Sequence, residues 1–103
     1  MLNPQYDDKL IKEKMSGMVI RYNAEKSFGF IRATDKAVKD DIFVYFNQIV
    51  PDFKNELLKL HQYQEVTFDL YSSKRGLVAK TVIRGEILTE ILISQVNSEK
   101  SEY

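Results

Sequence analysis

Hydrophobic and polar residues alternate over several short segments of the chain. The clearest case is residues 65–71, where Val66, Phe68 and Leu70 alternate with mostly polar neighbours. Successive side chains of a strand point to opposite faces, so this spacing predicts a half-buried strand with those three residues inside. The same reasoning predicts four further strands, at about 18–23, 27–32, 42–46 and 77–83.

The segments between these strands carry turn residues and loops. Residues 23–26 are expected to form a short turn, and residues 72–76 a hairpin loop that ends in glycine. Between the second and third predicted strands lies a charged loop, at 33–41. The connection between the third and fourth strands, at 47–64, is long enough to include a helical turn at Asn55–Leu60. Short strands with a long third-to-fourth connection predict an all-β fold, a five-stranded antiparallel Greek-key barrel of the OB type.

Two predicted strands carry aromatic rings where a half-buried strand would expose polar residues. Phe28 and Phe30 share one face of the second strand, and Phe43 and Tyr45 share one face of the third. Rings exposed on neighbouring strands make a surface on which unpaired bases stack. The alternative is that these rings fill the core, as we expect of Phe46 and Phe68. Period-two alternation favours the stacking surface, because the intervening aliphatic residues already point inward. Gly29, between two rings, is expected to serve the fold by allowing close backbone approach.

Two segments resemble the ribonucleoprotein motifs of the cold-shock domain family. Lys26–Ile31 is similar to the first motif, Lys-Gly-Phe-Gly-Phe-Ile, and Ile42–Phe46 to the second, Val-Phe-Val-His-Phe. The resemblance extends over residues 16–84 and includes the family's first strand at Gly17–Asn23. It implies an OB barrel that binds single-stranded RNA or DNA and acts as a nucleic-acid chaperone in stress response or transcription.

The chain departs from the family pattern at positions that bear on binding. Arg21 stands where the family has a stacking Trp, Ser27 replaces the motif Gly, and Tyr45 replaces the usual His. A guanidinium and a Tyr ring still lie flat on a base, so the surface is altered but retained. The resemblance implies that nucleic acid contacts nine residues: Arg21, Tyr22, Lys26, Phe28, Phe30, Phe43, Tyr45, Phe46 and Phe53.

Two flanks, residues 1–15 and 85–103, lie outside the predicted barrel domain at 16–84. In the first, Asn3 and Pro4 are typical of a helix start, and Lys12 and Lys14 of a helix end. In the second, apolar residues recur at helical spacing from Ile87 onward, with a continued strand as the alternative. Such a stripe predicts docking on the barrel, a homodimer or another protein partner.

The charge balance differs along the chain, although the whole chain has a net charge of zero. Residues 16–84 contain 11 Lys/Arg and 8 Asp/Glu, a difference of +3, whereas residues 85–103 contain 1 and 4, a difference of −3. Since the local field attracts phosphates, the neutral total does not argue against a nucleic-acid ligand.

Composition narrows the remaining classes of function. There is no cysteine, and the single histidine, His61, has no catalytic constellation around it, so we expect no enzyme, no cofactor and no metal site. No apolar run approaches the ~18 residues of a membrane span, and no signal peptide is evident. We therefore expect no membrane contact and a cytoplasmic location.

The leading function is binding of single-stranded RNA or DNA with low sequence preference. The alternative is a cold-shock-like barrel that serves as a protein-interaction module, with weak or no nucleic-acid binding. The Arg at position 21, the neutral charge and the apolar flanks favour this alternative.

Overall fold

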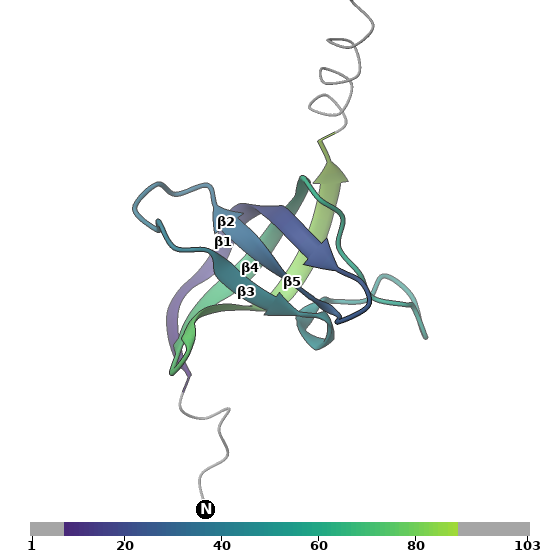
Figure 1. The fold of residues 1–103 in the computed structure, drawn as a ribbon, viewed down its shortest axis with the longest axis horizontal. Helices are drawn as coiled ribbons and strands as arrows, with labels where there is room; N and C mark the ends of the chain where they lie inside the picture. Colours follow the sequence, from purple (N-terminus) through teal and green to yellow (C-terminus); the bar gives the residue numbers. More distant parts are fainter. Residues whose placement is uncertain (1–7, 89–103) are drawn as a thin grey trace, which may run out of the picture.

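The computed structural model describes residues 8–88, and these form a closed barrel (Figure 1). The strands follow the order β1-β2-β3-β5-β4, and β4 returns to β1. Neighbouring strands are antiparallel except β3 and β5, which run parallel where Phe43 faces Val78. This confirms the predicted all-β OB-type barrel. Its elements are β1 (Lys9–Asn23), β2 (Phe28–Ala33), β3 (Ile42–Tyr45), the 3-10 helix η2 (Phe46–Gln48), β4 (Gln64–Ser73) and β5 (Gly76–Ile87).

The core is formed by the inward residues of all five strands. In β4, Val66, Phe68 and Leu70 are buried, which confirms the alternation expected there. The aliphatic residues that alternate with the rings of β2 and β3 are buried as well, so the rings themselves lie on the opposite, outer face. The largest fully buried side chains are Phe68, Ile31, Ile42, Leu70, Val19, Val44 and Val82.

Gly29 lies at a close approach of β2 to β1. A Cβ atom at this position would be 2.3 Å from the backbone oxygen of Arg21 and 2.8 Å from the ring of Tyr22. Backbone cannot yield to such a contact as a flexible side chain can, so the expectation that Gly29 serves the fold is confirmed.

The N-terminal flank differs from the sequence-based expectation. Lys9–Met15 is not helical but is the first half of β1, and it pairs with β4 from Lys9 opposite Ser72 to Met15 opposite Phe68. A short isolated helix is marginally stable, whereas pairing with β4 supplies partners for the backbone. Residues 1–7, where the helix start was expected, lie outside the described residues.

The long connection after β3 also differs from expectation. Phe46 is not a core residue, because the chain turns into η2 directly after β3 and leaves its ring 37% exposed. The helical turn predicted at Asn55–Leu60 is absent, and Asn55 has a φ of 63°, which no right-handed helix allows.

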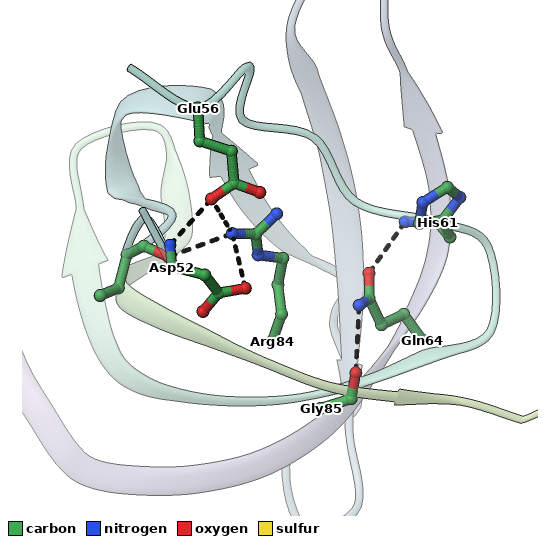
Figure 2. A network of polar contacts seen from close by, with 7 residues as sticks. Asp52, Glu56, His61, Gln64, Arg84 and Gly85 are labelled. Atoms are coloured by element: carbon green, nitrogen blue, oxygen red, sulfur yellow. Dashed lines mark hydrogen bonds and ion pairs between the residues drawn. The ribbon is translucent and has the colours of Figure 1, made fainter. Parts of the chain in front are cut away.

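Arg84 of β5 anchors this connection to the barrel (Figure 2). Its guanidinium lies 2.6 Å from Glu56 and 3.2 Å from Asp52, and the Arg84 and Glu56 side chains are only 11% and 12% exposed. The hydrogen bond from Arg84 is the largest cause that lowers the pKa of Glu56 to about 2. Next to this group, Gln64 accepts from the His61 amide and donates to the Gly85 carbonyl. The loop is therefore fixed at both ends.

The C-terminal flank begins as strand. Residues 85–87 complete β5, with Ile87 opposite Gln64, so the alternative of a continued strand holds as far as Ile87. The apolar positions from Ile91 onward lie outside the described residues. Within residues 8–88, no helix is long and apolar enough to cross a membrane.

Candidate nucleic-acid interface

Three phenylalanines of β2 and β3 form a contiguous group, here called the aromatic platform: Phe28, Phe30 and Phe43. The antiparallel register places Phe30 opposite Phe43 and Phe28 opposite Tyr45, so the faces that the alternation predicts to carry rings lie side by side. The rings of Phe28 and Phe43 are stacked at 5.5 Å, with 29° between their planes. Phe30 meets both edge-on, at 6.1 Å and 5.9 Å. The three rings are half-buried, so they brace one another and still present apolar surface to solvent.

Arg21 extends the platform onto β1. It lies opposite Phe30 in the register, and its guanidinium carbon is 4.9 Å from the centre of the Phe30 ring. A β-bulge between Val19 and Arg21 offsets the strand at this point. Arg21 thus keeps a flat, charged group at the edge of the rings, where cation–π attraction orients it.

A cleft of about 600 Å³ opens on this side of the platform. Arg21, Phe28 and Phe30 line it, together with Tyr22 and residues 23–25. Lys26 lies within the turn at 24–27 and is exposed, with its amide donating to the side chain of Asn23. Its backbone is therefore fixed in the turn whose residues 23–25 line the cleft.

Tyr45 and Phe46 continue the aromatic surface past the end of β3. Their rings are 4.9 Å apart and edge-on, and they are 41% and 37% exposed. A second cleft, of about 420 Å³, lies on this side and is lined by Phe43, Tyr45 and part of β5. The platform thus lies between two clefts. This arrangement is suited to an extended single-stranded ligand that runs from one cleft across the rings to the other.

Tyr22 is placed differently from the other predicted contacts. It lies opposite Gly29 and packs against the core, and its hydroxyl oxygen is buried with no hydrogen-bond partner. Burial, and then the nearby Tyr45, raise the pKa of Tyr22. Within residues 8–88 its ring takes part in none of the ring contacts of the platform, but Tyr22 lines the cleft of about 600 Å³ beside it.

Phe53 is also apart from the platform. It is 64% exposed on the loop after η2, and it takes part in none of the ring contacts found within residues 8–88. The same loop exposes Leu57, at 83%.

Three residues beside the platform were missed in the sequence analysis: Arg32, Tyr71 and Lys80. Arg32 follows Phe30 by two positions and therefore shares its outer face, a parity that could have identified it. It forms a 3.1 Å ion pair with Asp41. Lys80 forms a 3.0 Å ion pair with Asp8 and lies over the Tyr71 ring. These acidic partners reduce the positive field next to the rings.

The described part of the chain contains no candidate metal-binding site. Between residues 8 and 88, no group of three or more His, Cys, Asp or Glu side chains is placed to hold a metal ion.

The sequence of the barrel is similar to those of known proteins. The family profile described as "'Cold-shock' DNA-binding domain" matches residues 15–84. Cold shock-like protein CspG of Escherichia coli (strain K12) is 37% identical over 73 residues, which are 71% of this chain and 97% of that protein. Cold shock-like protein CspC of Bacillus cereus is 41% identical over 71 residues, 68% of this chain and 98% of that protein. Residues 1–14 lie ahead of the profile match.

Proposed function

The chain belongs to the cold-shock domain family, and we propose that it binds single-stranded RNA or DNA on the aromatic platform with low sequence preference. The observation that carries the proposal is the group of mutually braced rings on the outer face of β2 and β3, with a cleft on either side. Every base has a π-face, so stacking on such rings tolerates any sequence.

Each part of the interface has a distinct role in this proposal. Phe28, Phe30 and Phe43 stack bases, and Tyr45 and Phe46 extend the stack past β3. Arg21 covers the base or phosphate at the opposite edge, and Lys26 contacts the backbone. A strand held in this way is kept from pairing with itself, which supports a chaperone-like role for RNA in stress response or transcription.

The test is the titration of a labelled oligothymidylate with Phe30→Ala and Phe43→Ala. Loss of one base–aromatic stack costs about 1–3 kcal/mol, so we expect Kd to rise about 5- to 150-fold. Leu57→Ala is the matched control, since it removes an exposed apolar side chain away from the platform. Both Phe variants should keep a cooperative melting transition, because the core lies on the other face. Unchanged affinity with a lost transition would identify the rings as packing residues.

A second candidate function is that of a protein-interaction module. The observation in its favour is the pair of apolar side chains, Phe53 and Leu57, exposed on a loop that Arg84 anchors. The same titration separates the two functions. If the wild-type protein does not bind oligothymidylate or the matching RNA, the interaction module is the better account. The cytoplasmic location stays a prediction.

A further inference from the structure

The outer face that carries the platform continues around the barrel. Phe30 lies opposite Phe43, Phe43 opposite Val78, and Val78 opposite Tyr71. Cross-strand partners project to the same side of a sheet, so Tyr71 of β4 is the next ring on this face after Phe43. The surface available to a bound strand therefore extends beyond β2 and β3.

Lys80 is held tightly at this end of the face. Its ammonium nitrogen lies 4.5 Å from the centre of the Tyr71 ring and 3.0 Å from a carboxylate oxygen of Asp8. The Lys80 and Asp8 side chains are only 24% and 18% exposed. An ion pair this enclosed is screened less by salt than a surface pair, and the ring fixes where the ammonium lies.

The cleft of about 420 Å³ connects this ion pair to the platform. Phe43 and Tyr45 of the aromatic surface line it together with Lys80 and Asp8, and Asn47 and Gln48 also contribute to the lining. Its volume falls in the range of roughly 300–1,000 Å³ typical of small-molecule sites. Lys80 is the sole Lys or Arg among the described residues that line it. Phe43 and Lys80 line the same cleft, so a nucleotide stacked on Phe43 and reaching into this cleft meets a single Lys or Arg side chain among its described lining residues.

We propose that Lys80 is a phosphate subsite for the nucleotide beyond the platform, and that Asp8 keeps this subsite closed until the phosphate of a bound strand displaces its carboxylate. The inference rests on the proposed function. Asp8 lies ahead of the part of the chain that matches the family profile, so the closure belongs to the N-terminal extension of β1. Tyr71 keeps the ammonium in place when the carboxylate leaves.

The test is a double-mutant cycle in the full chain, with Asp8→Asn and Lys80→Gln, read as oligothymidylate affinity against salt. Asp8→Asn removes the carboxylate partner of the Lys80 ammonium group. The slope of the logarithm of the association constant against the logarithm of the salt concentration should therefore steepen by about 0.7. Affinity should then rise about two- to threefold more than in the wild type between ~200 and ~50 mM salt. Adding Lys80→Gln should cancel this gain, whereas adding Lys80→Arg should retain it. Glu86→Gln, which changes the net charge equally at the other end of β5, is the control.

Three outcomes would overturn the subsite. An Asp8→Asn gain that matches that of Glu86→Gln, or that survives Lys80→Gln, would reflect general charge alone. Weaker binding by Asp8→Asn would make Asp8 itself a ligand contact. A failure of the proposed function looks different, because Phe30→Ala would then bind as the wild type does. If no strand binds the wild type, both proposals are wrong.

Discussion

Ser27 offers a direct test of the hairpin that presents the platform. It occupies the position of the glycine in the family motif and has a φ of 63°, in the left-handed region. Its amide donates to the Asn23 carbonyl at 2.7 Å, and its carbonyl accepts from the Phe46 amide at 2.9 Å. These bonds fix the residue in a conformation that glycine adopts far more readily than serine. Ser27→Gly should therefore stabilise the protein.

The size of the effect follows from two opposing terms. A left-handed conformation costs an L-residue roughly 1–2 kcal/mol, and glycine avoids this cost. Glycine in turn loses about 0.5–1 kcal/mol more backbone entropy on folding. The net gain is about 0.5–1 kcal/mol, which corresponds to a rise in Tm of ~2–6 °C for a domain of this size. Both backbone hydrogen bonds remain, so oligonucleotide affinity should not change.

Thermal and urea unfolding of three variants checks this reasoning. Ser27→Ala keeps the Cβ atom and should remain within about 0.5 kcal/mol of the wild type. Ser72→Gly places a glycine at an exposed position in the extended strand β4 and should destabilise by about 0.5–1 kcal/mol. If Ser27→Gly melts at or below the wild-type temperature, the left-handed strain argued here is absent.

Three further predictions concern the interface edge, acid stability and the C-terminal flank. Arg21→Trp should tighten oligonucleotide binding by about 1 kcal/mol, the scale of one stack, and relax the salt slope slightly; weaker binding at every salt concentration would make Arg21 a primary contact. Glu56 has a folded pKa of about 2 against an ordinary 4.5, so the stability it contributes is complete above pH 4.5 and is lost as the pH falls towards 2. In urea titrations, Glu56→Gln should be less stable at neutral pH and flatter across that window, and parallel curves would contradict this. Truncation after Leu88 leaves β5 complete. If the flank docks on the barrel or dimerises, the truncation should lower the Tm or the sedimentation coefficient, while oligonucleotide affinity stays equal or rises slightly. An unchanged Tm and an unchanged sedimentation coefficient would make the flank a free tail.

The strands could be predicted where burial alone decides the pattern. Val66, Phe68 and Leu70 alternate without interruption, and the structure follows that alternation. Lys9–Met15 could not be assigned in this way, because its charged residues satisfy local helix rules while its backbone partner is β4, far away in the sequence. Local preferences of a few tenths of a kcal/mol per residue give way to such pairing.

The same distinction applies to the interface. The alternation of β2 and β3 was enough to bring Phe28, Phe30 and Phe43 together. The alternation wrongly predicted Phe46 to be a core residue. β3 ends at Tyr45, one residue earlier, and side chains alternate between two faces only within a strand. Lys80 was missed for another reason. Its partners are Tyr71 of β4 and Asp8, which directly precedes β1, and Asp8 is far from Lys80 in the sequence.

The formal charge of the barrel overstates the field that a phosphate meets at the platform. Of the cations near it, Arg32 is paired with Asp41 and Lys80 with Asp8, whereas Arg21 keeps its charge over the neutral Phe30 ring. Binding should therefore depend on stacking more than on counterion release, with a shallow salt slope in the wild type. In such a protein the acidic partners also set the affinity, because removing a carboxylate frees an existing cation from the partner with which a phosphate has to compete.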